Sequence, residues 1–141
     1  MKKIFAIMLL LLVAIQFVPY GKNHVNPKVI SEPQWDSPKT RALFMKACAD
    51  CHSNETKWPA YSSIAPVSWI VYNHVIDGRE HLNISAWGHQ KKNKGKDAVE
   101  ELEEGDMPLL AYVVAHPEAK LTDAETKLLM QGLKNTFGED D

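Results

Sequence analysis

The sequence Cys48-Ala49-Asp50-Cys51-His52 places two thiols and one imidazole at the spacing C-x-x-C-H. On a helix, side chains at positions i, i+3 and i+4 share a face, so Cys48, Cys51 and His52 would converge on one side of a short helical segment. Proteins hold a c-type haem at this spacing: the sulfurs form thioethers with its vinyl groups, and the imidazole approaches the iron. We therefore expect Cys48, Cys51 and His52 to bind one covalent haem c, with His52 as the proximal ligand.

Other uses of a C-x-x-C pair fit this sequence less well. A dithiol redox site is expected in a βαβ context, and no parallel-strand pattern surrounds the motif. A zinc site needs four ligands, but the sequence has no second C-x-x-C and no H-x₃₋₅-H pair. A disulfide between Cys48 and Cys51 would close a very short loop and add little stability. Haem attachment is therefore the favoured interpretation.

The amino terminus has the pattern of an export signal. Lys2 and Lys3 precede an apolar run over residues 4–18 that only Gln16 interrupts, as in a charged n-region followed by an h-region. No A-x-A-like cleavage site follows, and residues 4–20 are at the short end of what can span a bilayer. We expect residues 1–20 to be a signal anchor in the inner membrane, with the rest of the chain in the periplasm. The alternative is a cleaved signal peptide and a soluble periplasmic protein.

Length and charge restrict the class of protein further. The chain has 141 residues, enough for one small domain, and a formal net charge of −2. Without Lys2 and Lys3 the charge is −4, which is too mild and too mixed for a nucleic-acid-binding protein. Because both cysteines belong to the haem motif, no disulfide framework remains, and a bound haem would help to fill a small core.

The rest of the chain predicts an all-α fold. Residues 21–36 contain prolines and no hydrophobic period, which indicates a linker, and residues 37–141 form the expected haem-binding domain. Helix starts are indicated by Ser37 with Pro38 and by the capping box of Thr122 with Glu125. We expect a small cytochrome-c-like helical domain wrapped around one covalent haem and preceded by an apolar anchor helix.

Two further helices are less sharply marked. Helical spacing of apolar residues predicts a helix that begins at Pro66 and is closed by Gly78. A capping-box-like start at Asp97 predicts a short helix that ends at Gly105.

The second iron ligand would decide the chemistry, because two protein ligands favour electron transfer and an open site favours binding of small molecules. Met107 is the preferred candidate, since it lies between Gly105 and Pro108, where an irregular backbone can hold a thioether against the iron. His74 is the alternative, on the apolar face of the helix that begins at Pro66. The other candidates are Met130, His81, His89 and His116.

Two aromatic residues in the polar loop after the motif are also candidate site residues. Trp58 and Tyr61 are large amphipathic rings in a proline-interrupted segment. We expect them to cover an edge of the haem, which is compatible with ordinary core packing because the haem is part of the core.

Several blocks of the sequence, in the same order, resemble the bacterial haem-binding domain family of small single-haem c-type cytochromes. The resemblance covers about two thirds of the chain, from the motif to the final helix. The matching blocks are Cys48-Ala49-Asp50-Cys51-His52-Ser53-Asn54-Glu55-Thr56-Lys57-Trp58-Pro59, Tyr61-Ser62, Ile64-Ala65-Pro66-Val67-Ser68-Trp69, His74-Val75, Gly78-Arg79, Leu82-Asn83, Ser85, Trp87, Met107-Pro108-Leu109, His116-Pro117 and Leu121-Thr122.

The resemblance implies haem c attached at Cys48 and Cys51, ligation by His52 and Met107, and an amino-terminal membrane anchor. Ala60 and Ile84 depart from the family pattern, which has an aromatic residue and Phe there. These two changes would affect the exposure of the haem rather than its attachment.

Taken together, these features predict a periplasmic electron carrier that exchanges single electrons with redox partner proteins, rather than an enzyme. Nothing in the sequence resembles a second cofactor or an acid/base dyad. The alternative is a five-coordinate haem protein that acts as a peroxidase or a small-ligand sensor, for which His74 or Arg79 could supply a polar distal group. A haem-delivery role is disfavoured because the attachment would be covalent.

Overall fold

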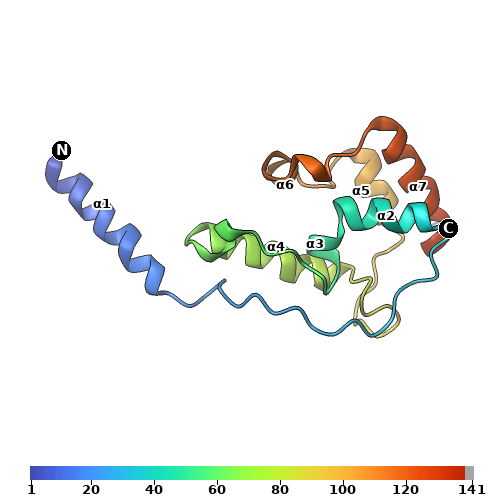
Figure 1. The fold of residues 1–141 in the computed structure, drawn as a ribbon, viewed down its shortest axis with the longest axis horizontal. Helices are drawn as coiled ribbons and strands as arrows, with labels where there is room; N and C mark the ends of the chain where they lie inside the picture. The colour runs from blue at the N-terminus through green and yellow to red at the C-terminus, as the bar shows by residue number, and fades with distance from the viewer. Residues whose placement is uncertain (139–141) are drawn as a thin grey trace.

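The computed structural model describes residues 1–138, and within them the chain is helical with no β-strand, which confirms the predicted all-α class (Figure 1). One isolated parallel bridge joins Ser31 to Ala86. The α-helices are α1 (Lys2–Ala14), α2 (Pro38–Ala47), α3 (Ala49–His52), α4 (Val67–His81), α5 (Ala98–Glu104), α6 (Leu110–Ala115) and α7 (Asp123–Phe137), and the 3₁₀ turns are η1 (Ile15–Phe17), η2 (Ala60–Ser63) and η3 (Pro117–Ala119).

The predicted anchor helix over the apolar run is not supported by the structure. Helix α1 has 13 residues and ends at Ala14, and none of the helices within residues 1–138 is long and apolar enough to cross a lipid bilayer. Pro19 disfavours helical backbone at the preceding residue, and Val18 is accordingly extended, with φ −73° and ψ 121°. Gln16 also ties this end of the segment to the domain, because its amide group exchanges hydrogen bonds of 2.8 and 3.0 Å with the backbone of Ala65.

Residues 21–36, which we predicted to be a linker, lie extended along the helical domain (Figure 1). The backbone N–H of Ile30 donates to the carbonyl of Ser85 at 2.8 Å. The His24 ring stacks on Trp58 with a centroid separation of 4.5 Å. This segment is therefore hydrogen-bonded and packed against the region that contains the haem motif.

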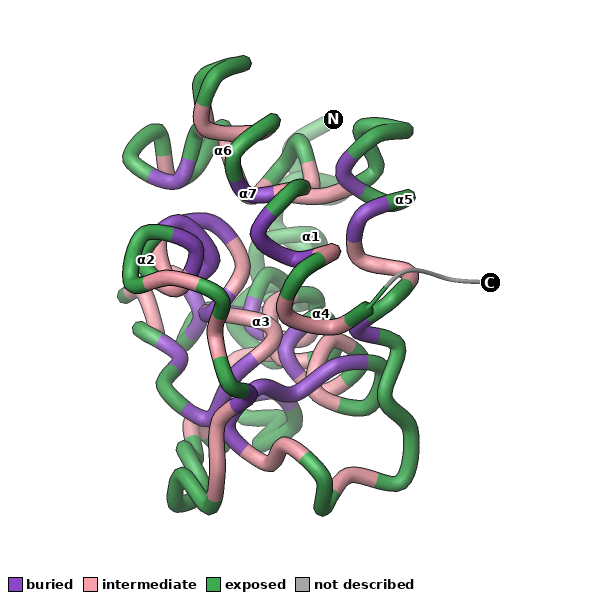
Figure 2. Tube along the Cα trace, turned by 90° about the vertical axis from the view of Figure 1, so that its right-hand side faces the viewer, coloured by how far each residue is buried: buried purple, intermediate pink, exposed green. Residues whose placement is uncertain are grey.

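The hydrophobic core lies between α2, α5 and α7. Phe44, Ile84, Leu129 and Leu133 are at most 1% exposed. Figure 2 shows buried stretches of chain on these helices. Helices α2 and α7 approach closely at Gly132, where an added Cβ would lie 2.0 Å from Thr40 Oγ1. From this core, α2 leads directly into the C-x-x-C-H motif.

Local signals placed two helix starts correctly and misplaced two other features. The Ser37 hydroxyl caps α2, and Thr122 and Glu125 form the expected capping box on α7. Asp97 does not cap α5, because its backbone is helical (φ −63°, ψ −20°) and an N-cap needs extended backbone. Helix α4 does not end at Gly78 but continues to His81. The glycine at position 78 serves the site instead of closing the helix.

Candidate functional site

The C-x-x-C-H motif forms one turn of helix at the end of α2. Cys48 is the residue between α2 and α3, and its carbonyl accepts from the N–H groups of Cys51 at 3.2 Å and His52 at 3.0 Å. Both cysteines are free thiols. Burial raises the pKa of Cys48 to about 12 and that of Cys51 to about 11, so both groups are protonated at neutral pH.

The motif opens onto a cavity of about 470 Å³, a size typical of cofactor sites. Most of the lining is apolar, and the polar residues are contributed mainly by α4 and by the region around α5. The lining residues are Phe44, Ala47, Cys48, Cys51, His52, His74, Asp77, Gly78, His81, Leu82, Lys94, Asp97, Ala98, Glu101, Leu102, Met107, Pro108, Leu109, Tyr112 and Leu133. The structure therefore brings Cys48, Cys51, His52 and Met107 to one apolar cavity.

The imidazole of His52 is oriented by backbone carbonyls. Its Nδ1 lies 3.0 Å from Gly78 O and 3.1 Å from Leu82 O, so Nδ1 carries the hydrogen and Nε2 has the free lone pair. A metal-ligating histidine is commonly fixed through its other nitrogen in this way. Burial lowers the pKa of His52, which favours the neutral ring that metals bind.

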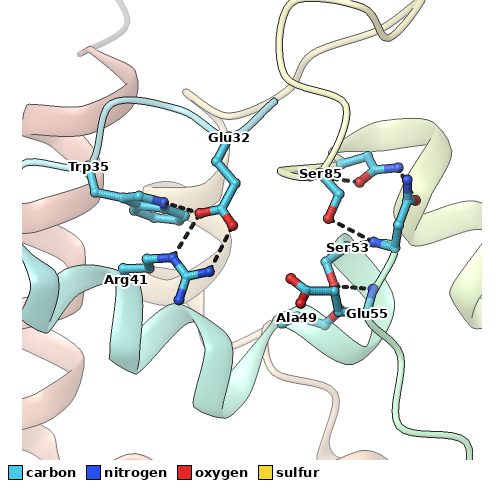
Figure 3. Close-up of polar contacts among 9 residues, drawn as sticks. Glu32, Trp35, Arg41, Ala49, Ser53, Glu55 and Ser85 are labelled. Atoms are coloured by element: carbon cyan, nitrogen blue, oxygen red, sulfur yellow. Dashed lines mark hydrogen bonds and ion pairs between the residues drawn. The ribbon is translucent and has the colours of Figure 1, made fainter. Parts of the chain in front are cut away.

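A buried polar network holds the chain that follows His52 (Figure 3). Ser53 Oγ donates to Ala49 O at 2.6 Å and accepts from the N–H of Glu55 at 3.0 Å. Ser85 Oγ accepts from the N–H of Asn54 at 3.0 Å. Buried polar groups with satisfied partners rigidify their surroundings. The turn that contains His52 is therefore held by the carbonyls at its ring and by the hydrogen bonds of the residues that follow it.

A second polar cluster ties the extended segment to α2. The Arg41 guanidinium donates to both carboxylate oxygens of Glu32 at 2.7 and 2.8 Å, and Trp35 Nε1 donates to the same group at 3.0 Å (Figure 3). The hydrogen bond from Arg41 lowers the pKa of Glu32. This cluster lies outside the cavity and supports the helix that leads into the motif.

Gly78 permits the close approach of α4 to the motif, because an added Cβ would lie 2.6 Å from Cys51 O. We predict that Gly78→Ala destabilises the protein by about 1–3 kcal/mol through overpacking, although alanine has the higher helix propensity. It should also lower the yield of haem-loaded protein, since Gly78 O orients His52. Thermal unfolding and the ratio of haem to protein measure both effects. The exposed Glu80 on the same helix gives the control Glu80→Ala, and equal behaviour of the two variants would contradict the prediction.

Among the candidates for the second ligand, Met107 and His74 line the cavity and differ in burial. Met107 is half-buried, whereas His74 is exposed on α4. The N–H of Met107 donates to Glu101 O at 3.0 Å, after Gly105 ends α5 in the left-handed conformation (φ 81°). His81 also lines the cavity and is exposed. Met130, His89 and His116 are not among the residues that line it.

Trp58 and Tyr61 are not among the lining residues either. Besides stacking on His24, Trp58 donates from Nε1 to Asn26 Oδ1 at 3.1 Å. The Tyr61 hydroxyl lies 2.6 Å from His116 Nε2. Both rings therefore make their contacts with residues outside the lining of this cavity.

Arg79 is not among the residues that line the cavity. Its guanidinium donates to Ser53 O at 2.8 Å, Thr56 Oγ1 at 2.8 Å, Asn26 Oδ1 at 2.9 Å and Val25 O at 3.1 Å. It therefore joins the extended segment to the loop after the motif, and its donors are engaged there.

Sequence reasoning gave Gly78 a different role, as the end of a helix, and did not single out Tyr112. Tyr112 lies within a segment that is otherwise apolar, and its hydroxyl donates to Asp50 Oδ2 inside the motif at 2.7 Å. A tyrosine at the centre of an apolar run is a weak signal of a buried hydrogen bond. The partner, 62 positions away in the sequence, could not be identified without the fold.

A small all-helical domain with C-x-x-C-H at the wall of an apolar cavity defines a class, that of the haem proteins. Comparison with protein families identifies the family within this class. The family model described as "Haem-binding domain" matches residues 10–135, and the chain belongs to this family. Haem binding is thereby supported, and the predicted family is confirmed. No curated protein and no solved structure gave a significant match.

Proposed function

We propose that this protein is a monohaem c-type cytochrome that transfers single electrons. In this proposal Cys48 and Cys51 hold the haem covalently, each thiol adding its S–H across a vinyl group. His52 Nε2 is the proximal ligand and Met107 the second ligand. When bound, the haem supplies an iron that alternates between the ferric and ferrous states.

The observation that carries the proposal is the orientation of His52. Its Nδ1 is engaged by two backbone carbonyls, which leaves Nε2 for a metal, and the same ring lines the cavity together with both cysteines of the motif. A zinc or dithiol site would not require a cavity of about 470 Å³ with a mostly apolar wall.

Electron transfer is favoured over catalysis by the residues around the second ligand position. Met107 lines the same cavity and is half-buried, and a thioether with an imidazole gives the ligand pair typical of electron-transferring cytochromes. Arg79, which could have supplied a distal polar group to a peroxidase, is engaged elsewhere by four hydrogen bonds. His74 remains the alternative ligand.

The proposed location is the periplasmic side of the inner membrane, with redox proteins as partners. The support is the charged and apolar amino terminus, which resembles an export signal, and the chemistry of haem attachment, which takes place after export. Separation of the cells into membranes, soluble periplasm and cytoplasm, followed by haem staining of each fraction, tests this location. Haem-stained protein in the cytoplasmic fraction would contradict it.

The test of the proposed function is the absorption spectrum of the full-length protein matured with haem c, oxidised and reduced, with and without carbon monoxide. We expect a low-spin spectrum with a far-red sulfur-to-iron band and no shift on adding carbon monoxide. A high-spin spectrum that shifts readily would instead indicate an open iron, and hence a peroxidase or a gas sensor.

A further inference from the structure

Helix α6, which follows the Met107 segment, has little apolar burial to hold it. None of its six residues is buried (Figure 2), and Leu110 and Val114 are 78% and 72% exposed. Figure 1 shows α6 apart from the group formed by α2, α5 and α7, across from α4. Because buried apolar area is the main source of stability for a short helix, the position of α6 depends on other contacts.

Two side-chain hydrogen bonds join this region to the elements across from it. Tyr112 donates to Asp50 Oδ2 at 2.7 Å. At the end of α6, His116 Nδ1 faces Glu118 Oε1 at 3.1 Å, so its Nε2 accepts from the Tyr61 hydroxyl at 2.6 Å. The Tyr112 ring also stacks on His116, with centroids 4.7 Å apart.

Asp50, which lies between the two cysteines, is held in place by two further hydrogen bonds. Its Oδ1 accepts from the N–H of Lys57 at 2.9 Å, and its carbonyl accepts from Thr56 Oγ1 at 2.7 Å. Burial and the Asp50 carboxylate raise the pKa of Tyr112, so the phenol keeps its hydrogen. A bond to an ionised acceptor is stronger than a neutral one.

We propose that Tyr112 is a positioning residue: its hydrogen bond to Asp50 holds residues 107–115 against the C-x-x-C-H motif and thereby keeps Met107 in place at the cavity. Only Pro108 and Leu109 separate Met107 from α6, and both line the same cavity as Tyr112. Because this connection is so short, a displacement of α6 would also displace Met107. The inference rests on the proposed function for the role of Met107, whereas the tie between α6 and the motif stands on the contacts alone.

The test is Tyr112→Phe in the full-length, haem-loaded protein, which removes one hydroxyl and leaves the ring that stacks on His116. We expect amide hydrogen exchange in residues 110–115 to become about tenfold faster, as for the loss of a charge-assisted hydrogen bond. We also expect the sulfur-to-iron band to weaken and carbon monoxide to bind, with unchanged covalent haem. Asp50→Asn, which leaves a weaker acceptor, should change both readouts in the same direction and by less.

The matched control is Tyr72→Phe, since Tyr72 lies on α4 in contact with Tyr20 and is not among the cavity residues. Unchanged exchange in residues 110–115 of Tyr112→Phe would overturn the proposed tie. Faster exchange with an unchanged sulfur-to-iron band would overturn the link to Met107. If the unmodified protein lacks this band, the proposed function fails, and the exchange measurement still decides whether Tyr112 holds α6.

Discussion

The double variant Cys48→Ala, Cys51→Ala is expected to lose all covalently attached haem. The two sulfurs are the only thiols in the sequence, and both line the cavity together with His52, so no other group can form a thioether there. Haem staining after denaturing electrophoresis and extraction with acidified acetone measure the loss. The variant should also unfold at a lower temperature than the matured protein, because a ligand bound only to the folded state stabilises that state.

The single variants provide the control for this experiment. Cys48→Ala and Cys51→Ala each keep one thiol, so a reduced fraction of acid-resistant haem is expected from both. Normal covalent haem in the double variant would contradict the assignment of the motif and, with it, the c-type proposal.

Met107→Ala is expected to open the sixth coordination site and lower the reduction potential. The side chain of Met107 lines the cavity, and a methionine paired with histidine raises the potential of a haem iron. Truncation to alanine removes the sulfur and leaves space at the iron. Loss of the sulfur-to-iron absorption band, binding of carbon monoxide and a lower midpoint in a redox titration are the readouts.

Met130→Ala is the matched control, because Met130 packs against the hydrophobic core cluster and is not among the cavity residues. It should reduce stability without changing the ligand-sensitive spectrum. An unchanged spectrum in Met107→Ala would transfer the assignment to His74, which lines the same cavity, and His74→Ala would then be expected to open the site.

Local sequence signals were correct for two helix caps and for the haem motif, although the signals at Asp97 and Gly78 were wrong. The Ser37 cap and the capping box of Thr122 and Glu125 each join residues three positions apart, and the C-x-x-C-H spacing places three side chains on one turn. The apolar run at the amino terminus was less informative: its composition predicted a longer helix, but the structure ends α1 at Ala14, and the contact between Gln16 and Ala65 spans 49 positions.

By itself the sequence determined the helical class, the haem motif and the family, because these depend on residue types at short, fixed spacings. Only the tertiary structure decided how the site is held. The carbonyls that orient His52 belong to Gly78 in α4 and to Leu82 just after it, 26 and 30 residues further along the chain, and the acceptor of Tyr112 lies in the motif itself. Such contacts depend on how the helices pack against one another, and packing is a property of the whole chain that no short pattern encodes.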